Sequence, residues 1–123
     1  MQHNIKSIRP FVGAEHFETS RRFYSDLGFT EVILSFDMSV FKSGMFAFYL
    51  QDAYVKDWVD NTMVFLEVND LDKYWHDINS LKLTEKYENV RLKPIVEYDW
   101  GREFFLHDPS GILCVIVKTS SDK

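Results

Sequence analysis

The spacing of apolar and polar residues predicts the same series of elements in each half of the chain, namely a strand, a helix and three further strands. In the first half, Phe17, Phe23, Tyr24 and Leu27 lie along one helical stripe. Gly28 follows the stripe and suits the left-handed residue that ends many helices. A strand candidate precedes this helix at residues 5–14, and three short strand candidates follow it at 29–36, 38–43 and 45–51.

The second half repeats this order. Residues 62–68 form an apolar strand candidate, and Asn69 is a residue type that caps helices. The helix after it has apolar residues spaced by three and four, at Leu71, Tyr74, Trp75, Ile78 and Leu81. Three more strand candidates follow at 93–99, 102–107 and 112–118. The sequence therefore predicts an α+β fold of two βαβββ modules whose sheets form one curved surface.

The modules are predicted to span about residues 5–52 and 62–119, joined by a linker at 53–61. A length of 123 residues fits a single domain, residues 1–123, with its own core. Pro10 lies inside the first strand candidate and has no amide hydrogen to donate. It therefore indicates a sheet edge or a crossing point rather than a central strand.

Composition narrows the class of protein. The sequence is 46% hydrophobic and 27% charged, which excludes a disordered chain. No apolar run approaches the roughly 20 residues of a membrane helix, and no secretory leader is recognisable, so no membrane partner is expected. The net charge of −5 and the lack of a basic cluster argue against nucleic-acid binding. The single cysteine, Cys114, lies in an apolar run, so we expect a buried structural thiol and a cytoplasmic location.

The stretch WGREFFLHDPSG, residues 100–111, holds most of the candidate chemistry. His107 and Asp108 are adjacent, so in a strand their side chains would point to opposite faces, and we expect no catalytic dyad there. Asp108, Pro109 and Gly111 occupy the positions that these residue types favour in a β-turn. We therefore interpret the end of the stretch as structural and predict no catalytic residue.

Three segments resemble the vicinal oxygen chelate superfamily, which includes glyoxalase I, extradiol dioxygenases and bleomycin resistance proteins. FETSRRFYSDLGF is similar to its first helix and the turn after it. EVNDLDKYW is similar to the start of its second helix, and HDPSGILCVI to its closing hairpin. The resemblance covers nearly the whole chain and implies the glyoxalase/bleomycin resistance fold, in which the curved sheet forms a cup.

The enzymes of this superfamily hold a divalent metal in the cup with His, Gln or Glu. The corresponding positions in this sequence are Arg9, Met63 and Val115. Arginine, methionine and valine do not supply the oxygen- and nitrogen-rich ligand set of such a site. We therefore expect no metal and no other cofactor.

Within the superfamily, the resemblance is to the bleomycin resistance proteins. It rests on DNT at 60–62, on WGREF at 100–104 and on DPSG at 108–111. Pro10 corresponds to the proline at which the first strand of those proteins crosses to the partner subunit. The resemblance implies a strand-swapped homodimer, without metal, that binds bulky cationic glycopeptide antibiotics of the bleomycin type in crevices between its subunits.

The resemblance and the chemistry of the side chains together suggest the residues of a ligand site. Trp100 would be a flat wall for an aromatic ligand and Gly101 would clear space beside it. Glu67 would meet a cationic group or pair with Arg9. At two positions where antibiotic binders carry phenylalanine, this sequence has Ile33 and Met38. The complete predicted set is Ile33, Phe36, Met38, Tyr49, Gln51, Asp60, Thr62, Phe65, Glu67, Trp100 and Gly101.

Three functions remain open at this level. The first is a metal-free, non-enzymatic protein that sequesters a bulky cationic or aromatic small molecule. The second is a lyase or isomerase of the same fold that uses a side-chain acid, Glu67 or Glu103, in place of a metal. The third is a structural or regulatory dimer with an unused cup.

Overall fold

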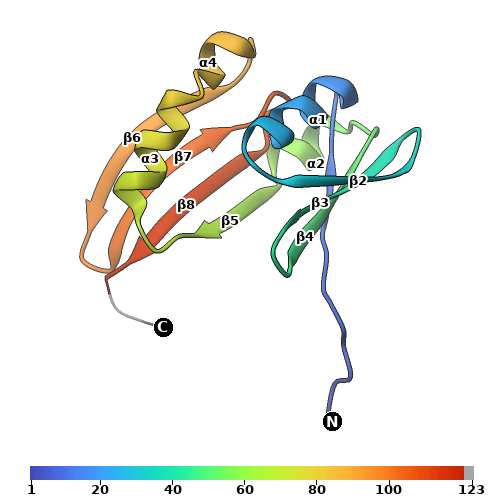
Figure 1. Cartoon of the computed structure of the whole chain (residues 1–123), viewed down its shortest axis with the longest axis horizontal. Helices are drawn as coiled ribbons and strands as arrows, with labels where there is room; N and C mark the ends of the chain where they lie inside the picture. The colour runs from blue at the N-terminus through green and yellow to red at the C-terminus, as the bar shows by residue number, and fades with distance from the viewer. Residues whose placement is uncertain (121–123) are drawn as a thin grey trace.

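The computed structural model describes residues 1–120 and contains two modules of the same construction (Figure 1). The first module comprises β1 (Phe11–Gly13), α1 (Phe17–Asp26), β2 (Thr30–Ser35), β3 (Met38–Ser43) and β4 (Phe46–Gln51). A short helix, α2 (Lys56–Asp60), lies in the linker. The second module comprises β5 (Met63–Glu67), α3 (Leu71–Ser80), α4 (Leu83–Lys86), β6 (Arg91–Tyr98), β7 (Gly101–His107) and β8 (Leu113–Thr119).

Each module forms a mixed four-stranded sheet in the same strand order. The orders are β1-β4-β3-β2 and β5-β8-β7-β6, so in each module the first strand pairs in parallel with the last. The other pairs are antiparallel neighbours in sequence. The predicted α+β fold of two βαβββ modules is confirmed.

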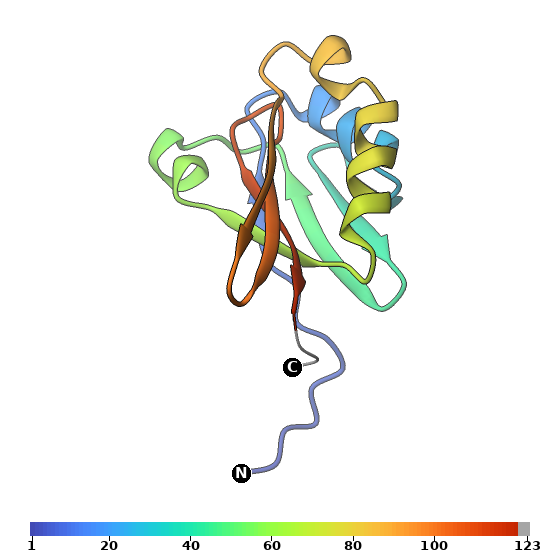
Figure 2. The ribbon, with the colours of Figure 1, turned by 90° about the vertical axis from the view of Figure 1, so that its left-hand side faces the viewer.

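The strand predicted at residues 5–14 was too long. Only Phe11–Gly13 pair with β4, and residues 1–10 run away from the body of the molecule as an extended arm (Figures 1 and 2). Pro10 cannot donate a backbone hydrogen bond, but its carbonyl oxygen accepts one from the Tyr49 amide at 2.9 Å. The proline therefore lies where the arm leaves the sheet.

Both long helices form where the apolar spacing predicted them. Gly28 ends the first helical segment with a φ of 106°, a conformation that glycine adopts without a steric penalty. The second helix begins one residue later than expected: the side chain of Asp70, not Asn69, caps it by accepting a hydrogen bond from the Lys73 amide at 3.0 Å. Helices α2 and α4 were not predicted, because helices of four or five residues carry too little periodicity to recognise.

One face of each sheet packs on the helices and forms the core. Buried side chains from both modules belong to the same cluster, among them Phe23, Phe41, Leu50, Phe104 and Ile116. Figure 2 shows α1, α3 and α4 together on one side of the strands. Burying these residues against one another holds the two modules together.

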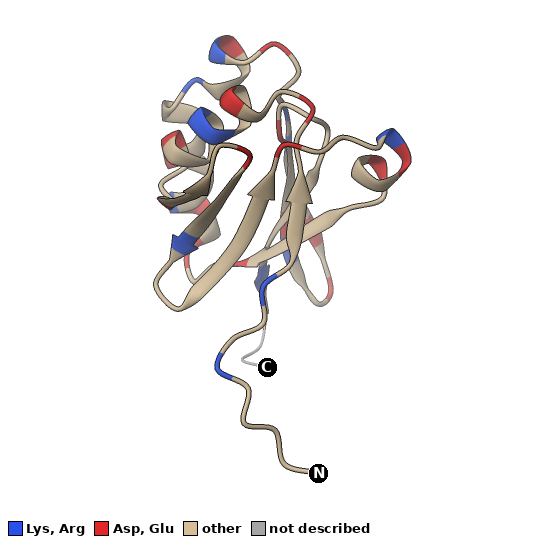
Figure 3. Ribbon diagram, turned by 90° about the vertical axis from the view of Figure 1, so that its right-hand side faces the viewer, with Lys and Arg blue, Asp and Glu red and all other residues tan. Residues whose placement is uncertain are grey.

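The other face of each sheet is left without a covering layer. Large apolar side chains on it remain exposed, including Phe11 on β1 (54%) and Met63 on β5 (65%). We call these surfaces the first open face, on β1 to β4, and the second open face, on β5 to β8. In Figure 3 the strands are mostly free of charged residues, whereas many Lys, Arg, Asp and Glu residues lie in helices and loops. Two sheet faces with this much exposed apolar surface are the principal unexplained surfaces of the described part of the chain.

Candidate functional site

The register of the second sheet fixes which side chains share the second open face. Residues directly opposite one another in a ladder point to the same side. Phe65 lies opposite Val115, Val115 opposite Phe105, and Phe105 opposite Lys93. The residues that the ladders place on this face are Met63, Phe65, Glu67, Leu113, Val115, Val117, Thr119, Gly101, Glu103, Phe105, His107, Arg91, Lys93, Val96 and Tyr98. The face is thus apolar in its centre and polar at both ends of β7.

Two aromatic rings close one end of the second open face. Tyr98 and Trp100 stack with ring centroids 5.2 Å apart and an interplanar angle of 7°. Both side chains are about half exposed, at 47% and 48%. A parallel aromatic pair with free outer surface is suited to extend its stack onto a flat or cationic ligand.

Gly101 follows Trp100 and lets two strands approach closely. A side chain here would overlap the Lys118 carbonyl oxygen and would lie 2.9 Å from the Thr119 Cα. The φ of Gly101 is 152°, which also disfavours other residues. The structure therefore accounts for this glycine through the contact between β7 and β8, whether or not a ligand lies beside it.

Two carboxylates lie toward the same end of the second open face as the aromatic pair, Glu103 on the neighbouring strand β7 and Glu67 on β5, at the opposite edge of the sheet. Glu103 lies two residues from Gly101 on β7 and is half-buried. Glu67 lies opposite Val117, and its carboxylate accepts a hydrogen bond from the Thr119 hydroxyl at 3.1 Å. One of the two roles expected of Glu67 was an ion pair with Arg9. No such ion pair forms within residues 1–120. Together these acids make the aromatic end of the face negative.

The other end of β7 is basic. Arg91 lies directly opposite His107, and Lys93 opposite Phe105. The Nδ1 atom of His107 is buried and has no hydrogen-bond partner in the described part of the chain. Burial, with the nearby charges of Arg91 and Lys93, lowers the pKa of His107 and favours its neutral form. Sequence reasoning had assigned His107 to the structural part of its stretch and had missed Arg91 and Lys93.

The first open face holds three of the predicted site residues. Tyr49 lies opposite Phe11, and the two rings stack 4.6 Å apart at 17°. Met38 lies opposite Gln51 at the end of β3. Arg9, just before β1, has a buried Nε atom without a partner in the described residues. Aromatic surface and an amide group are therefore available on this face also.

The remaining predicted residues lie elsewhere. Ile33 is opposite Ser39, a fully buried residue on the core side, although Ile33 itself is 63% exposed. Phe36 lies in the turn between β2 and β3 and is 91% exposed. At α2, Asp60 pairs with Lys56 at 2.6 Å, and the Thr62 hydroxyl donates to the Trp58 carbonyl oxygen at 2.6 Å. In the single chain these four residues do not join the residues of either open face.

The turn after His107 is structural, as predicted. One carboxylate oxygen of Asp108 accepts hydrogen bonds from the amides of Ser110, Gly111 and Ile112, each at 2.9 Å. The other accepts one from the Tyr24 hydroxyl at 2.7 Å. Asp108 is fully buried, and this burial raises its pKa although the four donors oppose the shift. Its carboxylate thus fastens the β7–β8 turn to α1 and is not available for catalysis.

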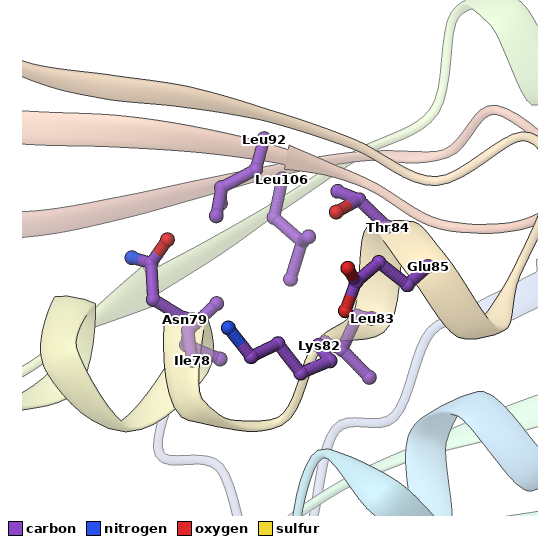
Figure 4. Close-up of a pocket in the computed structure, with 8 residues that line it drawn as sticks. All are labelled: Ile78, Asn79, Lys82, Leu83, Thr84, Glu85, Leu92 and Leu106. Atoms are coloured by element: carbon purple, nitrogen blue, oxygen red, sulfur yellow. The ribbon is translucent and has the colours of Figure 1, made fainter.

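A hollow lies on the helix side of the second sheet (Figure 4). It measures about 170 Å³ and has an apolar floor that includes Leu92 and Leu106. Lys82, Asn79 and Glu85 contribute polar groups to its lining. A space close to the ~150 Å³ that holds one benzene ring does not accommodate a bulky ligand. The open faces are therefore the better candidate site.

Residues 1–120 contain no group of three or more His, Cys, Asp or Glu side chains placed to hold a metal ion. Met63 and Val115 lie on the neighbouring strands β5 and β8, where a metal-binding relative would need nitrogen or oxygen ligands. In the same range, no helix is long and apolar enough to span a membrane.

Comparison with solved structures places this fold among known proteins. A bleomycin-binding protein in complex with bleomycin matches with a TM-score of 0.77 and 18% identity, over 94% of this chain and 100% of that one. A bleomycin-binding protein from Streptomyces verticillus, in complex with copper(II)-bleomycin, matches at 0.72 and 20%, over 99% and 100%. Lactoylglutathione lyase from Agrobacterium tumefaciens matches at 0.71 and 16%, over 94% and 96%.

These similarities establish the fold that the sequence resemblance implied. They include both binding proteins and an enzyme, so the fold alone does not select a function. No protein-family model matches the sequence, and no curated protein matches it.

Proposed function

We propose that this protein binds a bulky aromatic, cationic small molecule on its open sheet faces and releases it unchanged. The observation that carries the proposal is the end of the second open face, where Glu103 lies on β7, next to the strand of the Tyr98–Trp100 stack, and Glu67 lies across the sheet on β5. Flat aromatic surface next to carboxylates attracts cationic rings through stacking and charge. An antibiotic of the bleomycin type is the ligand that the similar solved structures suggest.

We further propose that the binding unit is a metal-free homodimer in the cytoplasm. The single chain exposes Ile5 (58%) and Ile8 (83%) on its N-terminal arm, together with both open faces. A second copy would cover this apolar surface and would receive the arm, which has no partner beyond Pro10 in its own chain among the described residues. The ligand crevice would then lie between the open faces of two subunits.

The binding role is tested by titrating bleomycin and the dye proflavine into the wild type and the Trp100→Ala variant by calorimetry. Loss of the stacking wall should weaken the binding of either probe by about 1–3 kcal/mol. Trp58→Ala is a comparison variant, because Trp58 is 72% exposed and lies on α2 in the linker rather than on a strand or turn of the second sheet. Equal affinities of wild type and Trp100→Ala for both probes would refute the stacking role, and a changed probe recovered after incubation would refute binding without turnover.

Sedimentation equilibrium at micromolar concentration tests the assembly, and elemental analysis tests the metal. We expect a dimer with no stoichiometric transition metal. A monomer throughout the concentration range would contradict the shared crevice. About one bound metal ion per chain would contradict the metal-free site.

A further inference from the structure

At the basic end of the second open face, no carboxylate of the described residues pairs with the positive charges of Arg91 and Lys93. Arg91 and Lys93 lie on β6, two residues apart, and their ladder partners on β7 are His107 and Phe105. All four therefore point to the same side of the sheet. Arg91 and Lys93 are exposed, and neither forms an ion pair with a carboxylate in the described part of the chain.

Two other arginines of this chain, Arg21 and Arg102, are paired with carboxylates. Arg102, also on β7 but on the opposite face, contacts Asp72 at 2.9 Å and Glu97 at 3.2 Å. Arg21 contacts Glu18 and Glu31. Two cations side by side, next to a half-buried histidine and in a protein of net charge −5, repel one another unless an anion joins them. Burial is the main cause of the lowered pKa of His107, and the charges of Arg91 and Lys93 lower it further.

We infer that Arg91, Lys93 and His107 bind an oxyanion group, a phosphate or a carboxylate, of the molecule held on the second open face. Arginine and lysine supply charged donors for such a group, and His107 lies directly opposite Arg91 to complete the site. The inference rests on the proposed function, because it takes the second open face to be the ligand-binding face. It adds a second binding group on that face. The ligand is then bipolar, with a cationic aromatic part at Tyr98–Trp100 and an anionic part at the far end of β7.

The strand geometry sets the length of such a ligand. Gly101 and His107 are the first and last residues of β7. At a rise of about 3.3 Å per residue the two ends lie roughly 20 Å apart. A ligand that reaches both must be an extended molecule of many ring or chain atoms. The apolar residues between the ends, Phe105 and Val115, would contact its middle.

The test uses three probes that share one ring system: 1-naphthyl phosphate, 1-naphthoate and the neutral 1-naphthalenemethanol. Each is titrated into the full-length wild type and the double variant Arg91→Gln/Lys93→Gln, at about 50 mM salt so that screening stays moderate. We expect the wild type to prefer the two anions, and the double variant to lose on the order of tenfold or more of that affinity. The affinity for the neutral probe should stay unchanged.

Arg22→Gln is the matched control, because Arg22 is exposed on α1 and its loss changes the net charge by one unit far from this face. A second readout is the ring signal of His107 in NMR spectra, which should shift when 1-naphthyl phosphate or 1-naphthoate binds and stay in place with the neutral probe. Melting curves establish that each variant is folded.

Equal binding of the anions by the wild type and the double variant would overturn the inference. So would an equal loss in Arg22→Gln, which would mean that only overall charge matters. Failure of the proposed function is separate: it appears as unchanged proflavine binding in Trp100→Ala, a measurement that does not involve Arg91 or Lys93. A preference for the phosphate over the carboxylate, or the reverse, supports the site and identifies the anion.

Discussion

Replacing Asp108 with alanine should destabilise the fold strongly, although the residue lies in a turn. Two buried donors would lose their acceptor, namely the Tyr24 hydroxyl and the Ile112 amide, and the Ser110 amide would lose its acceptor at a partly buried position. The Gly111 amide keeps a bond to the backbone oxygen of residue 108 at 3.0 Å. An unsatisfied buried donor costs about 1–3 kcal/mol, so two of them predict a loss of roughly 2–6 kcal/mol. This is a large part of the 5–15 kcal/mol typical of a domain.

Tyr24→Phe removes one donor only and should cost about 1.5–3 kcal/mol, the range for a hydrogen bond to a charged group. The free energy of unfolding of wild type, both single variants and the double variant is measured by urea titration at neutral pH, followed by fluorescence and circular dichroism. Asp37→Ala is the control, since Asp37 accepts a bond from Ser35 at an exposed site and its loss should change stability by less than about 0.5 kcal/mol. A coupling energy near zero between Tyr24 and Asp108 would show that the bond does not fasten the turn.

Three further predictions concern single groups. Burial raises the pKa of Cys114 to about 12, so the folded protein should not react with a thiol reagent at pH 8, and one thiol per chain should react after unfolding. Hydrogen bonds from Arg21 lower the pKa of Glu31 below its usual 4.5, so the stabilisation from this pair is present above that pH and is lost as the pH falls through the lowered value. The difference in unfolding free energy between wild type and Glu31→Gln should therefore shrink in acid, and a constant difference would contradict this. Gly101→Ala should lower the melting temperature by several degrees, because the new methyl group meets the backbone of β8 at Lys118, and an unchanged melting curve would refute the close approach.

The sequence was sufficient for those parts of the fold that depend on local patterns. The spacing of Leu71, Tyr74, Trp75 and Ile78 specifies a helix because only neighbouring residues decide it. The strand order could be predicted from the resemblance to the superfamily and from the internal repeat. The turn at Asp108 was recognisable from its residue types. Its buried bond to Tyr24 was not, because the two residues lie far apart in the chain.

The basic end of the second open face was missed for a physical reason. The ladder between β6 and β7 shifts between Lys93 and Val96, so these two residues point to the same side although three positions separate them. A strict alternation assigns them to opposite faces. Pro94 lies at this irregularity and cannot donate to the ladder. His107 was judged only against its neighbour Asp108, whereas the residue directly opposite it in the ladder is Arg91 on the adjacent strand.

The pairing of the first strand of each module with the last strand has a consequence for how the chain folds during synthesis. The antiparallel strands β6, β7 and β8 form hairpins from adjacent segments, but β5 finds its partner only when residues 113–119 have been made. Until then both edges of Met63–Glu67 present unpaired backbone groups, and such edges recruit strands from other chains. Non-local pairing of this kind also slows folding. A nascent chain interrupted before β8 would therefore be the form of this protein most prone to aggregate.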